Sequence, residues 1–305
     1  MRYSIVICTH NGSPRLGSTL KHLAELDYPS KEIELLLIDN NSSDGTADYA
    51  GTQWKELGEP FRINILSEPR QGLSNARFRG CAEARAEYLV FCDDDNWLQP
   101  DYLRVADEVL LPNPEIGVLG GQGVPVTDAP AFPNWFYSYA SGYAVGVQAM
   151  ESGDISARGY VWGAGMILRR ETLSAIYGLG IRSLLSDRSG ADLGSGGDSE
   201  ICKWLLASGY RLWFESALTF KHFIPAQRLT EAYLRGQWRG FEGAGVVLSC
   251  YDQLLRRRDL RRARGKHLAL WVKAEIRGML FWVAPDRRRV LRAFGRLQGL
   301  RRGRL

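Results

Sequence analysis

The feature that most constrains the fold is a regular alternation, over the first hundred residues, of short apolar runs with segments of helical periodicity. The apolar runs are rich in β-branched residues and each leads into polar side chains: RYSIVICTH at 2–10, EIELLLIDN at 32–40, FRINILSE at 61–68 and EYLVFC at 87–92. Strands that are almost continuously apolar are typical of parallel sheets covered by helices on both faces. The alternation therefore predicts an α/β fold with a mostly parallel central sheet flanked by helices.

The residues between the first two runs carry the marks of a helix start. Ser13 is a candidate N-cap, and Pro14 follows at the first helical position, where its missing N–H costs no hydrogen bond. Leu16, Leu20 and Leu23 then recur at helical spacing. We therefore expect strand and helix to alternate from the first residues onward.

The ends of the four expected strands collect polar side chains. Thr9, His10 and Asn11 follow the first strand, Asp39 ends the second, Glu68 and Arg70 follow the third, and Asp93, Asp94 and Asp95 follow the fourth. In sheets of this kind, ligands bind outside the carboxyl ends of the strands. The sequence contains neither GxxxxGK nor a helix-opening GxGxxG, which argues against a P-loop and a dinucleotide site. We expect a site that holds its ligand through carboxylates.

Three consecutive aspartates at the end of a buried strand call for a compensating positive charge. A hard cation such as Mg²⁺ or Mn²⁺ binds carboxylate oxygens and keeps positions open for phosphate oxygens. Adjacent side chains of an extended segment point to opposite sides, so Asp93 and Asp95 can face one ligand while Asp94 faces away. The alternative is an Asx turn in which the aspartates cap the helix expected near Pro100.

Several segments of the chain resemble the signature blocks of a known enzyme family. SIVICTHNG, LLLIDNNSSDGT, GLSNARFRG and LVFCDDDNWLQPDYL, within residues 3–103, are similar in order and spacing to those of the family 2 glycosyltransferases. GAGMILRRETL, GSGGDSEICKWLLASGYRLWF and KHF resemble the later blocks and extend the resemblance to about residue 250. The resemblance implies the Rossmann-like fold called GT-A, a nucleotide-diphosphate-sugar donor and transfer of the sugar with inversion.

The resemblance also implies roles for single residues. It implies contacts with the nucleotide sugar for Thr9, His10, Asn11, Asp39, Asp44, Arg70, Arg77, Asp93 and Asp94, and a place at the metal for Asp95 and His222. Three of these residues have simpler alternative interpretations. Asp44 could cap its own helix, Arg77 could be a solvated helix residue, and His222 could be purely structural.

A transfer with inversion needs a base that takes the proton of the attacking hydroxyl. The segment GGDSEIC supplies Asp198 and Glu200 at the start of an amphipathic helix. In the family's usual acidic pair the second acid is the base, and that position is Asp198 here. The first acid is replaced by Gly197, a departure that leaves Glu200 as a rival base. Asp198 could also serve only as a helix cap.

The charge is divided unevenly along the chain. Residues 251–305 hold 17 Lys and Arg against 4 Asp and Glu, although the net charge of the whole chain is only +5. Apolar residues recur every three or four positions between these arginines, which predicts basic amphipathic helices that bind an anionic membrane surface or pack on the main domain. We expect a GT-A domain at 1–250, with a nucleotide-sugar half at 1–124 and an acceptor and catalytic half at 125–250, followed by a helical basic tail.

The expected function is transfer of a sugar from a nucleotide-diphosphate donor, with a UDP-sugar favoured, to a hydroxyl acceptor such as a lipid-linked sugar. It would use Mg²⁺ or Mn²⁺, involve no nucleic acid and contribute to a cell-envelope polysaccharide or glycolipid. Five scattered cysteines, no recognisable signal peptide and no apolar stretch of roughly 18 residues indicate a cytoplasmic protein, peripheral at the inner face of the plasma membrane. The alternatives are an inactive nucleotide-binding scaffold at the membrane and a nucleotidyltransferase.

Overall fold

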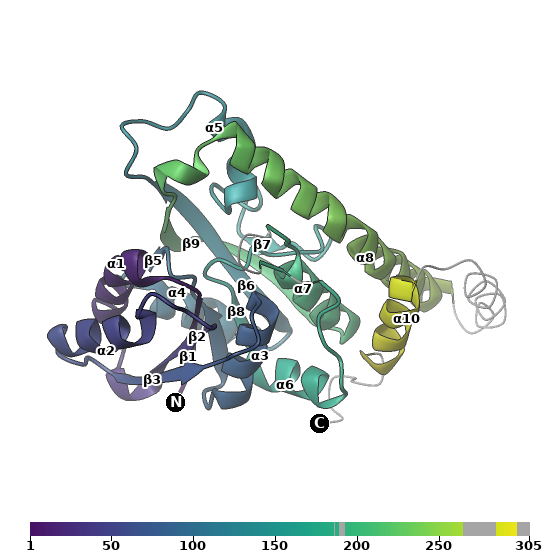
Figure 1. Ribbon diagram of the computed structural model, residues 1–305. Coiled ribbons are helices and arrows are strands. Elements are labelled where there is room, and N and C mark those ends of the chain that lie inside the picture. The colour runs from purple at the N-terminus through teal and green to yellow at the C-terminus, as the bar shows by residue number, and fades with distance from the viewer. Residues whose placement is uncertain (186, 189–192, 265–284, 298–305) are drawn as a thin grey trace.

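The computed structural model describes residues 1–185, 187–188, 193–264 and 285–297. These residues form a nine-stranded sheet with helices on both faces, and a long helix extends from the top of the molecule down its right side (Figure 1). The strand order is β3-β2-β1-β4-β8-β6-β9-β5, with β7 paired to β9. The predicted α/β architecture is confirmed.

The first half of the sheet is parallel, as the alternation predicts. Its strands are β1 (Tyr3–Thr9), β2 (Ile33–Asp39), β3 (Arg62–Ser67) and β4 (Tyr88–Phe91), connected through α1 (Ser13–Ala24), the 3₁₀ turn η1 (Ser30–Glu32), α2 (Thr46–Glu56) and α3 (Leu73–Glu83). All three pairings among these strands are parallel. One local expectation is wrong: the N-cap of α1 is Gly12, and Ser13 is the first helical residue. The hydroxyl of Ser13 donates instead to Asp44.

The second half of the sheet is mixed. It contains β5 (Asn96–Leu98), β6 (Ile116–Val126), β7 (Gly153–Asp154), β8 (Ile167–Arg169) and β9 (Arg211–Phe223), with α4 (Tyr102–Leu110), α5 (Phe136–Tyr139), η2 (Ala140–Tyr143), α6 (Arg170–Gly178), α7 (Gly197–Ala207) and η3 (Ala226–Arg228). Strand β8 runs antiparallel to both β4 and β6, and β5 runs antiparallel to β9. Strand β9 therefore returns beside the aspartates that follow β4.

The hydrophobic core has two layers, one on each face of the sheet. Along β1, Ile5 and Ile7 pack with α1, α2 and α4, while Val6 points to the other face and packs with α3, α6 and α7. Successive side chains of a strand alternate between faces, so a strand that is apolar throughout fills both layers. Helices thus cover both faces of the sheet. A ligand can therefore approach the sheet where the strands end.

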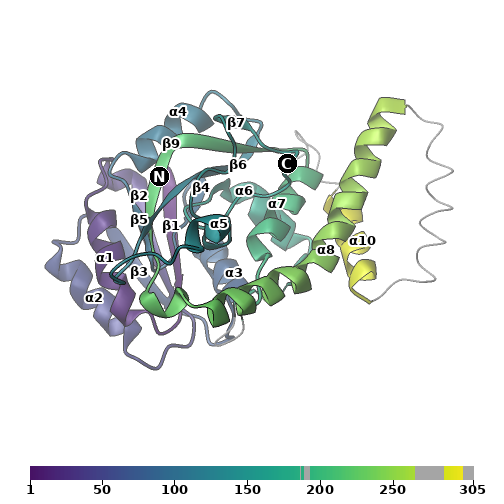
Figure 2. The same cartoon turned by 90° about the horizontal axis from the view of Figure 1, so that it is seen from above.

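The expected boundary at residue 250 falls inside a helix. Helix α8 (Glu231–Arg264) runs through residue 250, and α10 (Pro285–Leu297) lies against it (Figure 2). Val290, Phe294 and Leu297 are buried in the core layer that contains α7. Residues 265–284 and 298–305 of the expected basic tail lie outside the described residues. None of the described helices is long and apolar enough to cross a membrane.

We predict that Phe294→Ala lowers the free energy of unfolding by about 3–5 kcal/mol, because it leaves a cavity between α10 and the main domain. Urea unfolding followed by circular dichroism measures this change. Arg292→Ala, on the exposed side of the same helix, is the matched control and is expected to change stability little. Equal stability of the two variants would show that α10 does not pack on the domain in solution.

Candidate functional site

A cavity of about 870 Å³ opens at the carboxyl edge of β1 and β4 and reaches toward α7 and α8. Eight of the residues singled out from the sequence line it: Thr9, His10, Arg77, Asp93, Asp94, Asp95, Asp198 and His222. They come from segments as far apart as the first strand and the ninth. The other five, Asn11, Asp39, Asp44, Arg70 and Glu200, are not part of its lining.

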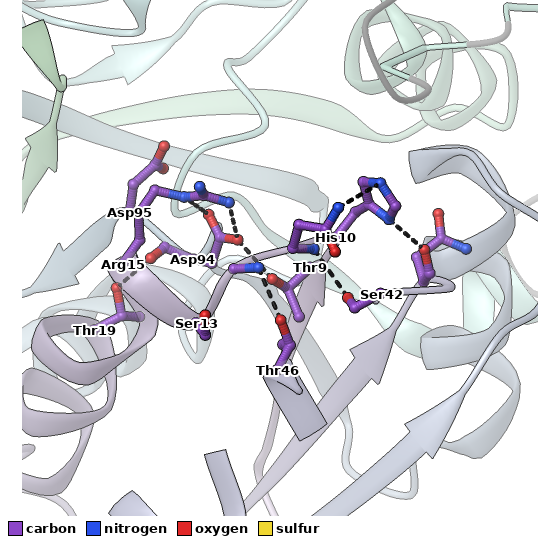
Figure 3. Close-up of polar contacts among 12 residues, drawn as sticks. Thr9, His10, Ser13, Arg15, Thr19, Ser42, Thr46, Asp94 and Asp95 are labelled. Atoms are coloured by element: carbon purple, nitrogen blue, oxygen red, sulfur yellow. Dashed lines mark hydrogen bonds and ion pairs between the residues drawn. The ribbon is translucent and has the colours of Figure 1, made fainter. Parts of the chain in front are cut away.

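Asp94 ties the end of β4 to helix α1. Its carboxylate accepts two hydrogen bonds from Arg15, at 3.0 and 2.8 Å, and one from the hydroxyl of Thr9 at 2.6 Å (Figure 3). The Thr19 hydroxyl donates to the main-chain oxygen of Asp94 at 2.9 Å. A side chain at Gly12 would collide with Thr9 and Asp94, so glycine is required for this close approach. Asp94 therefore fixes the position of its neighbours. Arg15 was missed from the sequence because its spacing is that of a solvated helix residue.

Asp95 points into the cavity toward β9. One carboxylate oxygen lies 3.4 Å from Nε2 of His222, and the other accepts a hydrogen bond from Arg228 at 2.7 Å. The β5–β9 ladder pairs Asn96 with His222, which is why the two segments meet. Burial would raise the pKa of Asp95, but His222 and Arg228 hold that pKa well below its usual range. Asp95 is therefore an anion held between two nitrogen-bearing side chains.

Asp95 and His222 also have the chemistry of metal ligands. Nε2 of His222 faces Asp95, while its Nδ1 is buried and has no hydrogen-bond partner. A carboxylate and an imidazole together suit a divalent cation such as Mn²⁺. Within the described residues, no group of three or more His, Cys, Asp or Glu side chains could hold a metal. Asp95 and His222 thus fit two positions of a metal whose remaining ligands would come from elsewhere.

Asp93 is a partly buried carboxyl group that lines the same cavity as Asp95. Burial and the charge of Asp95 raise the pKa of Asp93 to about 6, against the opposing effects of Arg77 and His222. A carboxyl group with this pKa takes up a proton readily near neutrality. A cation or a donor hydroxyl in the cavity would stabilise its charged form.

Asp198, in the first turn of α7, also lines the cavity. One of its carboxylate oxygens accepts a hydrogen bond from the main-chain N–H of Gly163 at 2.7 Å, and the other from that of Ser199 at 2.6 Å. These bonds fix the orientation of the carboxylate, which still lines the cavity. A helix N-terminus also stabilises a negative charge. The N-cap of α7 is Gly196, so Asp198 is not the helix cap, and its carboxylate lines the cavity.

Arg77 is buried, contrary to its interpretation as a solvated residue. Its side chain is only 5% exposed, and it donates to Asp187 at 2.9 Å. Burial would lower the pKa of Arg77, but the charges of Asp187, Asp93 and Asp198 raise it. Asp187 was not among the sequence candidates, because nothing in the glycine-rich segment around it distinguishes it from a loop residue.

The predicted residues outside the lining shape the loops behind it. Asp44 accepts hydrogen bonds from the main-chain N–H groups of Ser13, at 3.2 Å, and Thr46, at 3.0 Å, and from both of their hydroxyls. Burial would raise the pKa of Asp44, but these bonds lower it to about 2. Asp39 and Asn11 accept from the N–H groups of Ser42 and Ser43, respectively. The exposed Arg70 forms an ion pair with the buried Glu68.

Glu200, the rival base, is fully buried behind the cavity wall. Its carboxylate accepts hydrogen bonds from the hydroxyls of Ser183 and Tyr251 and from the N–H groups of Leu184 and Leu185. These contacts link α7 to α8 and to the segment before Asp187. Burial nevertheless outweighs the hydrogen bonds and raises the pKa of Glu200 to about 6.

Aromatic residues form the part of the wall between the two carboxylate groups. Seven of them line the cavity: Tyr139, Tyr143, Tyr160, Trp162, Tyr233, Trp238 and Phe241. Tyr139 and Trp238 meet edge to face, with ring centroids 6.2 Å apart, and remain 39% and 49% exposed. Aromatic rings that stay exposed at a cavity offer contact surface to a ligand with apolar faces, such as a sugar ring.

Residues 4–131 match the protein family described as "Glycosyl transferase family 2". The succinoglycan biosynthesis protein ExoM of Rhizobium meliloti is 25% identical over 253 residues, which are 82% of this chain and 76% of ExoM. A cholesterol galactosyltransferase of Borreliella burgdorferi is 32% identical, but the match covers 34% of this chain and 28% of that protein.

Two solved structures share the fold over almost the whole chain. S. aureus TarS 1–349 in complex with UDP has a TM-score of 0.55 at 16% identity, covering 98% of this chain and 83% of that one. The mannosyltransferase PcManGT of Pyrobaculum calidifontis, in complex with GDP-Man and Mn²⁺, has a TM-score of 0.53 at 18% identity, covering 97% and 86%. At these identities the likeness concerns the fold, and it confirms the GT-A expectation.

The raised pKa of Glu200 predicts a pH-dependent stability. Between the ordinary pKa of 4.5 and the folded-state pKa of about 6, the unfolded chain has released the proton while the folded chain retains it. Stability therefore falls as pH rises through this window, by about 2 kcal/mol in total. Urea unfolding at pH 4.5 and 7 should show this fall in the wild type and a smaller one in Glu200→Gln. The same pH dependence in both proteins would contradict the assignment.

Proposed function

We propose that the protein, whose residues 4–131 match the family 2 glycosyltransferases, transfers a sugar from a nucleotide-diphosphate donor to a hydroxyl acceptor with inversion at the anomeric carbon. The observation that carries the proposal is that carboxylates from distant segments line one cavity. Asp93 and Asp95 follow β4, and Asp198 lies in the first turn of α7. Donor and acceptor would meet between them.

The chemistry is a single displacement. An acceptor hydroxyl attacks the anomeric carbon from the face opposite the diphosphate, its oxygen forms the new glycosidic bond, and the bond to the diphosphate breaks. Asp198 takes the hydroxyl proton as general base. The N–H groups of Gly163 and Ser199 hold its carboxylate in one orientation, which matters because proton transfer requires hydrogen-bond distance. Asp93 orients the donor sugar.

Asp95 and His222 are the proposed holders of a divalent cation, Mg²⁺ or Mn²⁺. When bound, the cation would offset the negative charge of the leaving diphosphate. Arg228 already neutralises one oxygen of Asp95, and its guanidinium lies where it could also contact a phosphate. The PcManGT complex, with GDP-Man and Mn²⁺ on the same fold, supports the choice of metal.

The relatives suggest a setting for the reaction. ExoM is named for succinoglycan biosynthesis, and a further relative, TarS, is named a poly(ribitol-phosphate) β-N-acetylglucosaminyltransferase. We therefore propose an acceptor from a cell-envelope polysaccharide or glycolipid, and a UDP-sugar as the first donor to test. The basic residues after position 251 support a place at an anionic membrane surface.

Calorimetric titration with UDP, GDP and dTDP, each with and without Mn²⁺, tests the donor class. Binding of one nucleotide that strengthens with Mn²⁺ is the expected result, and the sugars of that nucleotide would then be screened with lipid-linked and soluble acceptors. A folded protein that binds none of the three would contradict the proposed transferase activity.

Substitutions of Asp95 and Asp198 should impair different steps of the reaction. Asp95→Asn is expected to remove the Mn²⁺ dependence of nucleotide binding, because the charged metal ligand is lost. Asp198→Asn should leave nucleotide binding intact and lower the transfer rate by about 10²–10⁴-fold, the usual contribution of a general base. Glu200→Gln is the matched comparison. Loss of transfer in Glu200→Gln, with normal turnover in Asp198→Asn, would reassign the base to Glu200.

A further inference from the structure

The resemblance to family 2 glycosyltransferases implies an acidic pair at the start of α7, but position 197, where its first member would stand, is glycine. The space beside Gly197 is nevertheless occupied by a carboxylate. A Cβ placed on Gly197 would collide with Oδ2 of Asp187 and would lie 3.1 Å from its Cγ. The carboxylate of Asp187 therefore lies where the side chain of residue 197 would begin. Gly197 does not have a positive φ, so its backbone is open to other residues and only the space excludes them.

Asp187 is built into the wall of the cavity and is not a surface residue. Its side chain is 7% exposed and its backbone has a φ of +54°, a conformation that costs energy for residues other than glycine. A buried carboxylate is stable only when it is paired. The pair is the 2.9 Å ion pair with Arg77, whose own side chain is 5% exposed.

Arg77 extends from Asp187 toward the proposed base. A Cβ on Gly163 would lie 2.8 Å from Nη2 of Arg77 and 3.2 Å from Oδ2 of Asp198, so both groups border the same small space. The opposite guanidinium nitrogen, Nη1, is bound by Asp187. Arg77, on α3, thus binds the carboxylate of Asp187 and borders the same small space as the carboxylate of Asp198.

From this geometry we infer that Asp187 replaces the carboxylate missing at position 197 and is a positioning residue for the transfer. It holds the guanidinium of Arg77 beside Asp198 and so fixes the environment of the base. The role of Asp198 rests on the proposed function and the expected acid at position 197 on the family resemblance, whereas the shared space of residues 187 and 197 rests on the contacts alone. The acidic pair is therefore complete in space although it is incomplete in sequence.

A relocation experiment tests the inference. Asp187→Ala removes the carboxylate, and the Cβ that remains would be 3.4 Å from a new Cβ at position 197, an ordinary contact. The double variant Asp187→Ala/Gly197→Asp then returns a carboxylate from the other side of the same space. Asp187→Ala/Gly197→Ala fills the space equally well near the backbone but carries no charge, so it is the matched control.

Transfer should fall by about 10²-fold in Asp187→Ala, because Arg77 and Asp198 lose their fixed geometry, while nucleotide affinity stays close to that of the wild type. The double variant with Asp at position 197 should recover most of the lost turnover, and the double variant with Ala should not. Asp252→Asn breaks the Lys203–Asp252 ion pair outside the cavity and controls for loss of stability alone.

Unfolding measurements test the shared space without any substrate. Gly197→Ala and Asp187→Ala should each destabilise the protein, but the double variant with Ala should lose less than the sum, because removal of the carboxylate also removes the collision. Additive losses would overturn the inference whatever the protein transfers.

The remaining outcomes separate the inference from the proposed function. If Asp187→Ala transferred the sugar at the wild-type rate, only the positioning role would be overturned. Recovery of turnover in both double variants would overturn it too, because charge at this place would then be dispensable. A wild-type protein that transfers no sugar would overturn the proposed function and the positioning role together.

Discussion

The pairing of buried carboxylates with arginines is the constraint on which the rest of the site depends. Asp94 is paired with Arg15, Asp187 with Arg77, and Asp95 with Arg228. Charges taken out of water are tolerated only when they are paired and hydrogen-bonded. Asp94 and Asp95 follow β4, and Asp187 lies in the segment before α7. The arginines that pair with them come from α1, η3 and α3, respectively.

These pairs also connect the two halves of the fold. Arg228 follows β9 but binds the aspartate after β4, and Arg77 belongs to α3 but binds a residue of the segment before α7. These ionic contacts therefore connect the two halves of the fold, in addition to the continuous sheet.

Burial separates the carboxylates by role. Glu200 is enclosed by four hydrogen-bond donors and links α7 to α8, while Asp198, two residues earlier, is held by two main-chain N–H groups and still faces the cavity. Asp44 accepts hydrogen bonds from Ser13 and Thr46 behind the cavity, and the Asp39 carboxylate accepts one from the N–H of Ser42 there. Asp198 and Glu200 thus belong to one sequence motif, but only the carboxylate of Asp198 faces the cavity.

The sequence by itself determined the alternation of strands and helices, the aspartates at the end of β4 and the placement of Asp198, because apolar periodicity and local turns depend on near neighbours. It could not show that β8 reverses the sheet, that α10 packs on the domain, or that Arg15, Arg77 and Arg228 are counter-ions of buried carboxylates. An arginine on a helix has the same local pattern whether it is solvated or paired. Gly197 and Asp187 are the clearest case: ten positions apart in sequence, they share one space, and only tertiary packing decides which of them carries the carboxylate.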